Sequence, residues 1–231
     1  DLIIAGGSES MSRAPFVMPK AESAFDRRAE IYDTTIGWRF VNPAMKKQYG
    51  VDSMPQTGQN VADDYGISRE AQDAMALASQ AKAAAAIANG RLAQEITPVT
   101  IPQRKGDPLV VAQDEGVRPD TTAESLGALR PAFAKDGTIT AGNSSPLSDG
   151  AAALVVTSRA FAEEKGLTIL ATVGAPGQTA GPDSSQLHSQ PSDAIAAAVR
   201  KQGWDVADLD FIEINEAFAS VVLRFQKDLE I

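Results

Sequence analysis

The strongest constraint on the fold is the alternation of strand and helix patterns in the last third of the chain. Apolar runs at 169–173 and 211–214 predict strands, and helical periodicity at 193–201 and 216–229 predicts helices. Strands and helices that alternate in this way are typical of a sheet covered by helices. The pattern therefore predicts an α/β fold with a parallel sheet.

Earlier segments contain both kinds of element. Strands are expected at 1–5, where Gly6-Gly7 closes the run, and at 96–101 and 150–156. Helices are expected at 57–65, 69–88, 122–129 and 158–165, and the region 8–51 is expected to be an irregular insertion.

The alanine-rich helix at 69–88 has clear end signals. Ser68 is a typical N-cap residue, and Asn89-Gly90 is a typical end. Helical spacing predicts an apolar stripe on this helix that packs into the core and needs no ligand; the stripe consists of Ala71, Ala74, Met75, Ala78, Ala81 and Ala85.

Composition excludes several classes of function. The 231 residues carry 21 basic and 30 acidic side chains, a net charge of −9, which argues against a general nucleic-acid binder. No apolar run approaches the roughly 18 residues of a membrane span. The chain has no cysteine, which excludes disulfides, zinc–thiolate sites and a cysteine nucleophile within it. His188 is the single histidine, so a multi-histidine metal site is excluded and no metal is expected.

Two segments are candidates for chemistry, and each has a structural alternative. Asn215 stands where a predicted strand ends and a predicted helix begins, so it is either an N-cap or a group that stabilises an oxyanion near the helix N-terminus. The small and polar residues at 141–145, which precede the apolar run at 149–153, are either a close-packed turn or a ligand-binding loop.

Together, these segments and three others resemble the thiolases, the acetyl-CoA acetyltransferases and 3-ketoacyl-CoA thiolases. The matching blocks occur in family order over essentially the whole chain: Ala5-Gly6-Gly7-Ser8-Glu9-Ser10-Met11-Ser12, Leu129-Arg130-Pro131-Ala132-Phe133, Gly137-Thr138-Ile139-Thr140-Ala141-Gly142-Asn143-Ser144-Ser145, Asp149-Gly150-Ala151-Ala152-Ala153 and Asn215-Glu216-Ala217-Phe218-Ala219.

The resemblance also shows what this chain lacks. Thiolases use a nucleophilic cysteine upstream of the first block, and a Gly-His-Pro histidine and a second cysteine downstream of the last. These would lie before Asp1 and after Ile231, so we expect an internal fragment of a longer enzyme that is inactive alone. The alternatives are a non-catalytic protein that binds CoA or acyl chains, and a structural fragment without a ligand.

The resemblance implies roles for individual residues. Asn215 is the expected catalytic residue, because it matches the asparagine that holds a water in an oxyanion hole. The expected substrate-binding residues are Ser145 at the pantetheine arm, Met54, Phe133 and Phe218 along the acyl and pantetheine tunnel, and Arg118 and Ser125 near the adenine. His188 precedes the Asn215 block, so it is not expected to be the catalytic histidine. It is expected to be a loop residue, and the alternative is a role near the acyl pocket that would bear on substrate choice.

The resemblance further implies an incomplete layered αβαβα fold with an inserted α+β loop domain. Residues 1–16 and 148–167 would belong to the N-terminal thiolase half, 17–147 to the loop domain that covers CoA, and 168–231 to the start of the C-terminal half. Coenzyme A would be a substrate, with no separate cofactor. The intact enzyme would be a homodimer or homotetramer, cytoplasmic and active in fatty acid metabolism, with acyl-CoA and CoA as partners and neither nucleic acid nor membrane.

Overall fold

A computed structural model describes residues 1–181 and 183–231. Its helices are α1 Pro43–Tyr49, α2 Met54–Asp64, α3 Arg69–Ala88, α4 Ala123–Gly127, α5 Arg159–Glu164, α6 Gln190–Gln202 and α7 Ala219–Leu229. Its strands are β1 Leu2–Ser10, β2 Phe16–Val17, β3 Tyr32–Asp33, β4 Val99–Ile101, β5 Leu109–Val111 and β6 Asp149–Thr157. The 3₁₀ turns are η1 Leu92–Gln94, η2 Ser184–Ser189 and η3 Val206–Asp208.

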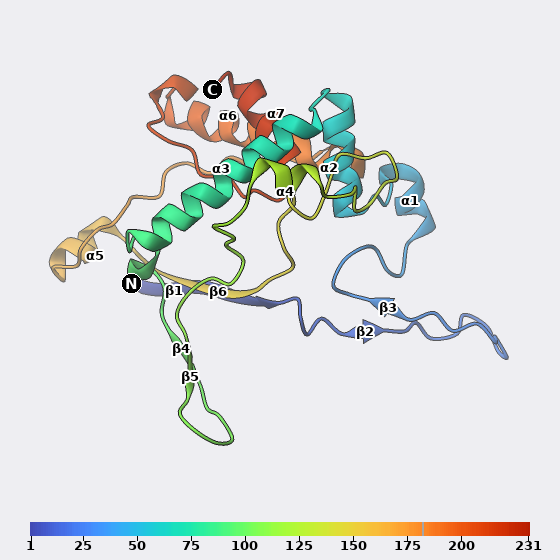
Figure 1. Ribbon diagram of the computed structural model, residues 1–231. Coiled ribbons are helices and arrows are strands. Elements are labelled where there is room, and N and C mark those ends of the chain that lie inside the picture. The colour runs from blue at the N-terminus through green and yellow to red at the C-terminus, as the bar shows by residue number, and fades with distance from the viewer. Residues whose placement is uncertain (182) are drawn as a thin grey trace.

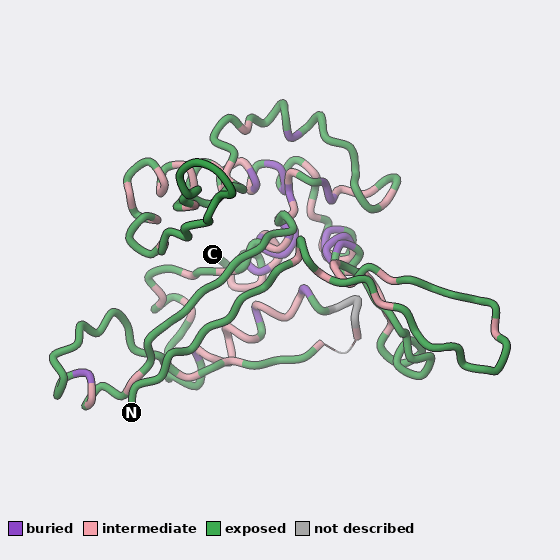
Figure 2. The backbone as a smooth tube through the Cα atoms, turned by 90° about the horizontal axis from the view of Figure 1, so that it is seen from below, coloured by how far each residue is buried: buried purple, intermediate pink, exposed green. Residues whose placement is uncertain are grey.

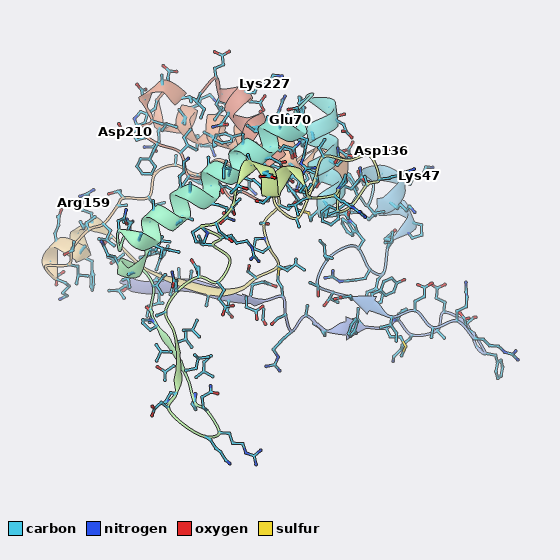
Figure 3. All side chains as sticks on the ribbon, viewed as in Figure 1. Lys47, Glu70, Asp136, Arg159, Asp210 and Lys227 are labelled. Atoms are coloured by element: carbon cyan, nitrogen blue, oxygen red, sulfur yellow. The ribbon has the colours of Figure 1, made fainter. Side chains whose placement is uncertain are left out.

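The helices α2, α3, α4, α6 and α7 gather on one side, above the long β1–β6 ribbon (Figure 1). The β2–β3 arm and the β4–β5 hairpin extend away from this body. Figure 2 shows that burial is concentrated in the helical part, whereas β1 is exposed along its whole length. Charged side chains such as Lys47, Arg159 and Asp210 lie at the periphery (Figure 3).

Strand pairing in the described residues differs from the expected parallel sheet. The strands form three two-stranded sheets, β1–β6, β2–β3 and β4–β5, and each pair is antiparallel. The runs at 169–173 and 211–214 are not strands. Both runs are apolar, but neither forms a hydrogen-bonded ladder with a described strand.

The β1 strand is longer than expected because Gly6-Gly7 continues it. Leu2 pairs with Thr157 and Ser10 with Asp149, so the ribbon passes straight through both glycines. A Cβ on Gly6 would stand 2.4 Å from the carbonyl oxygen of Ala152. The glycine therefore allows close approach of the two backbones, where the sequence had indicated a turn.

Several helix ends follow the capping signals. Ser68 accepts from the backbone N–H of Ala71 at 3.2 Å at the start of α3, as predicted. The helix α1 was not expected within the region 8–51. It is capped by Asn42, whose side chain accepts from Ala44 N at 2.9 Å, and it begins with Pro43, a favoured first helical residue.

The buried face of α3 is not the predicted alanine stripe. Its buried residues are Gln72, Asp73 and Ala76, whereas Ala71 and Ala74 are exposed. Polar partners in the facing loop decide which side of an alanine-rich helix is buried, and helical spacing alone does not reveal them. A small apolar core of Ile139, Phe218 and Val221 lies beside this face.

None of the described helices is long and apolar enough to cross a membrane.

Candidate functional site

The two segments that the sequence singled out are joined to each other by backbone hydrogen bonds. Ser145 N donates to Ala217 O and Ala219 N donates to Asn143 O, both at 3.0 Å. Between them, Ser144 and Phe218 form an antiparallel bridge. The loop that precedes β6 therefore serves as the partner strand for the stretch that leads into α7.

Asn215 is not the N-cap of this helix. The helix α7 begins at Ala219, and its N-cap is Phe218, which makes no side-chain capping bond. Residues 216–218 stay outside the helix, and the backbone of 217–219 pairs with 143–145 instead. The prediction that the helix starts at Glu216 was therefore wrong, and the carboxamide of Asn215 is not engaged as a cap.

An open cavity of about 490 Å³ lies at this junction. It is lined by Met75, Ala76, Ser79, Gln80, Gly142, Asn143, Ser144, Ser145, Pro146, Asn215, Glu216, Ala217 and Ala219. Asn215 and Ser145, expected at the oxyanion hole and the pantetheine arm, thus line the same cavity. One wall comes from α3, which the sequence analysis had described only as a packing element.

Two hydrogen bonds from α3 hold segments at or beside the cavity. Ser79 donates a short hydrogen bond to the carboxylate of Glu216, the neighbour of Asn215. Gln80 accepts from the backbone N–H of Arg118 at 2.8 Å, which ties the loop of this exposed arginine to the same helix. Sequence reasoning named neither Ser79 nor Gln80, because a serine and a glutamine on an alanine-rich helix carry no distinctive motif.

Phe218 and Met54, expected along the tunnel, lie around His188. The Phe218 ring is buried and meets the imidazole edge-on, with ring centroids 5.4 Å apart. The imidazole is hydrogen-bonded to the backbone carbonyl of Met54, the half-exposed first residue of α2. Burial lowers the pKa of His188, and this hydrogen bond offsets the shift only in part. His188, predicted as a loop residue, is therefore a buried side chain in the 3₁₀ turn η2, and its pKa lies below the ordinary value.

The remaining predicted residues lie outside this cavity. Ser125 forms a capping box with Thr122: it accepts from Thr122 N at 3.0 Å, and Thr122 Oγ1 accepts from Ser125 N at 3.1 Å. Ser125 therefore has a structural role in capping the N-terminus of α4. Phe133 is 54% exposed and is not among the lining residues. In the described part of the chain, no cluster of His, Asp and Glu could hold a metal ion.

Comparison with known proteins identifies the chain. The profile of the thiolase N-terminal domain matches residues 1–160, and that of the thiolase C-terminal domain matches residues 167–231. The chain belongs to the thiolase family. A β-ketoadipyl-CoA thiolase from Pseudomonas putida is 52% identical over 230 residues, which cover 99% of this chain and 57% of that relative.

Solved thiolase structures show the same fold. The acetyl-CoA acetyltransferase of Bacillus anthracis superposes with a TM-score of 0.86 at 36% identity. Human mitochondrial 3-ketoacyl-CoA thiolase in complex with CoA superposes with a TM-score of 0.82 at 32% identity. Each match covers the whole of this chain and 57% or 56% of the other. The predicted fold class, an incomplete thiolase fold, is thereby confirmed.

Proposed function

We propose that the protein to which this thiolase chain belongs transfers acyl groups between CoA thioesters, by Claisen condensation or by thiolysis of 3-ketoacyl-CoA. The supporting observation is the backbone pairing of 143–145 with 217–219, which brings Asn215 and Ser145 to one cavity. Family membership supplies the reaction class. The chemistry needs a thiolate, a proton carrier and donors that stabilise oxyanions.

Within this reaction, Asn215 is assigned to an oxyanion hole. A carboxamide has two N–H donors and one acceptor, so it donates to a developing oxyanion directly or holds a water that does so. Asn215 is exposed at the cavity and has no capping role that would occupy these groups. Ser145 is assigned to the pantetheine arm at the same cavity.

The rest of the substrate is assigned to residues around the cavity. Met54, Phe133 and Phe218 are the proposed apolar lining for the acyl chain and pantetheine. Arg118, whose guanidinium suits purine stacking and phosphate pairing, is proposed to bind the adenine end together with Ser125. Coenzyme A serves as substrate, with no separate cofactor.

The names of two relatives support the proposed class of substrate. Relatives are named β-ketoadipyl-CoA thiolase and, in Mycolicibacterium smegmatis, probable acetyl-CoA acetyltransferase, which support a 3-ketoacyl-CoA substrate. We further propose a homodimer or homotetramer in the cytoplasm that acts in fatty acid metabolism. Analytical ultracentrifugation and cell fractionation test these two points.

The 231 residues alone are proposed to be inactive, because they contain no cysteine to carry the acyl group. The same absence favours the second candidate, a thiolase-like protein that binds CoA without chemistry. A thiolysis assay on the chain tests the proposed inactivity, and calorimetry with CoA together with a thiolysis assay on the full-length protein separates the two candidates. Turnover by the pure chain would contradict the proposed inactivity, whereas tight CoA binding by a full-length protein that shows no turnover would favour the second candidate.

The oxyanion role is tested by Asn215→Ala in the full-length enzyme. Loss of one oxyanion donor should lower kcat by about 10²–10³-fold. Ser148→Ala is the matched control, since this exposed serine makes only a long 3.5 Å bond to Pro146 O and does not line the cavity with Asn215. An Asn215→Ala enzyme with wild-type kcat would refute the assignment.

A further inference from the structure

The position of Asn215 depends on a loop that belongs to another part of the chain. Asn215 precedes by two residues the point where Ala217 O accepts from Ser145 N at 3.0 Å. Ala219 N, two residues further on, donates to Asn143 O at the same distance. The stretch 211–214 before it pairs with no described strand. The backbone bonds to the loop at 143–145 therefore help to fix the position of Asn215.

The shape of that loop is held by the side chain of Asn143, which is 3% exposed. Its Oδ1 accepts from Thr140 N at 2.8 Å, and its Nδ2 donates to Thr138 O at 3.0 Å and to the Asp73 carboxylate at 3.1 Å. One carboxamide thus satisfies an N–H, a carbonyl and a carboxylate. Among side chains of this size, only asparagine offers two N–H donors and a carbonyl acceptor on one planar group.

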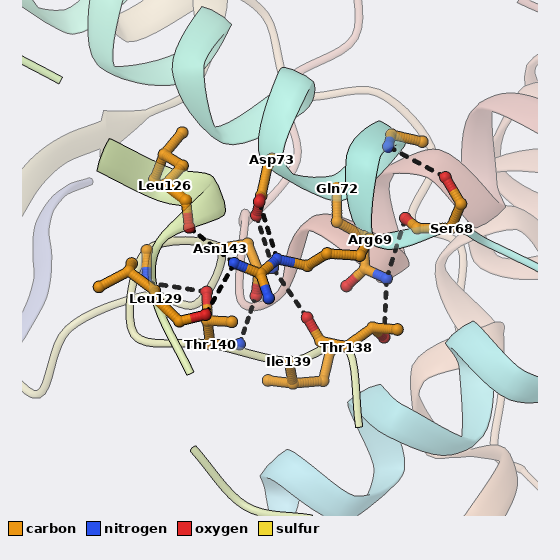
Figure 4. Close-up of polar contacts among 12 residues, drawn as sticks. Ser68, Arg69, Gln72, Asp73, Leu126, Leu129, Thr138, Ile139, Thr140 and Asn143 are labelled. Carbon is orange, nitrogen blue, oxygen red and sulfur yellow. Dashed lines mark hydrogen bonds and ion pairs between the residues drawn. The ribbon is translucent and has the colours of Figure 1, made fainter. Parts of the chain in front are cut away.

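Asp73 in turn is fixed by its own helix. Arg69 lies one turn earlier on α3, and its Nε is 2.7 Å from Asp73 Oδ2. The same guanidinium donates to the carbonyls of Leu126 and Leu129 at 2.6 and 3.1 Å. Figure 4 shows Arg69, Asp73 and Asn143 in contact between α3 and the loop. Asp73 and Asn143 are buried, and Asp73 is paired with both Arg69 and Asn143, so the carboxylate links α3 to the loop.

We propose that Asn143, anchored by Asp73, is the positioning residue that holds Asn215 in place for catalysis. This inference rests on the proposed acyl-transfer function. Asn143 does not act on the reacting atoms. It shapes 138–145 so that the backbone of 143–145 receives 217–219, and that pairing places the Asn215 carboxamide at the cavity. Misplacement of a reacting group by about 1 Å can cost around 100-fold in rate, so a small shift of the loop suffices.

The test variant is Asn143→Asp. It keeps the volume and the acceptor for Thr140 N, but it places a carboxylate against Asp73 and against Thr138 O. Gln72→Met is the matched control. Gln72 is fully buried on the helix that carries Asp73, and its side-chain hydrogen bonds go to Ile67 O, Ser68 O and Thr138 Oγ1 and not to 143–145. Where Asn143→Asp does not fold, Asp73→Asn is the second variant. It keeps the volume of the side chain but removes the charge that faces the Asn143 carboxamide and Arg69, and the same measurements apply to it.

The first measurement is hydrogen exchange at the amides of Ser145 and Ala219, which is independent of activity. We expect faster exchange at both in the Asn143 variant and wild-type exchange in Gln72→Met. Unchanged exchange at these amides in the Asn143 variant would overturn the proposal. Hydrogen exchange tests the positioning of Asn215 whether or not the full-length protein is active. Absence of acyl transfer in the full-length wild type would refute the proposed function and not the positioning.

The second measurement is a kinetic cycle in the full-length enzyme. We expect Asn143→Asp to lower kcat by about tenfold to 100-fold with KM for CoA nearly unchanged, and Gln72→Met to retain wild-type kcat. In an Asn215→Ala background, Asn143→Asp should change kcat by less than about twofold, because the group it positions is already gone. An equal fall in kcat with and without Asn215 would show a merely structural role and overturn the proposal.

Discussion

Gly58, in the middle of α2, offers a quantitative test of how tightly the Phe218 ring is packed. A Cβ built at this position would stand 2.8 Å from Phe218 Cγ and 2.9 Å from Cδ2. Both atoms are near the root of a ring that is 7% exposed, so the ring cannot swing aside as the tip of a flexible chain could. Overpacking of this kind costs about 2–3 kcal/mol, and replacing glycine by alanine in a helix returns about 1 kcal/mol.

The expected net loss for Gly58→Ala is therefore about 1–2 kcal/mol, equivalent to a fall in Tm of about 2–8 °C for a domain of this size. Urea unfolding and a thermal scan of the same protein measure it. Gly127→Ala is the control, because Gly127 is also helical and a Cβ there meets nothing within 4 Å. Wild-type stability of Gly58→Ala, or a larger loss in the control, would refute the packing argument.

Further predictions concern titrating groups and one cation–π contact. Burial lowers the pKa of His188, so on acidification the imidazole is protonated at a higher pH in the unfolded state than in the folded state. The free energy of unfolding should therefore fall as the pH drops below about 6.5. In His188→Phe, urea unfolding should no longer show this part of the pH dependence. Hydrogen bonds from Ser12 lower the pKa of the Asp149 carboxyl, so its NMR titration midpoint should lie below 3.8 and rise in Ser12→Ala; an unmoved midpoint would contradict this cause. The Arg224 guanidinium lies 3.2 Å from the centroid of the Tyr65 ring and is also paired with Asp228 at 2.8 Å. Tyr65→Leu removes the ring and keeps the ion pair, so it should lose about 1–2 kcal/mol in urea unfolding, and an unchanged midpoint would show that the ring contact is not stabilising.

Local signals in the sequence predicted most helices and the strands β1, β4 and β6, but they did not predict how the strands pair. Ser68 and Ser158 mark the starts of α3 and α5, because a side-chain cap is satisfied by the backbone within three residues. The strands expected at 169–173 and 211–214 are not formed, because a strand also needs a partner that local sequence does not specify. The same limit hid the continuation of β1 through Gly6-Gly7, which depends on the closeness of β6.

The candidate site divides along the same line. Motif blocks identified the family and named Asn215 and Ser145, since the order of short, specific segments survives in the linear sequence. The roles of Asp73 and Asn143 could not be read in this way. They stand 70 positions apart, and the hydrogen bond between them exists only when α3 packs against the 138–145 loop.

The sequence alone thus identified the thiolase family and the positions of most helices, because both depend on residues close together in the chain. Folding in three dimensions chose the buried face of α3, kept Asn215 out of the helix, and brought it to the same cavity as Ser145. The physical reason is that buried polar groups must find partners, and the partners available to 143–145 and 217–219 are each other.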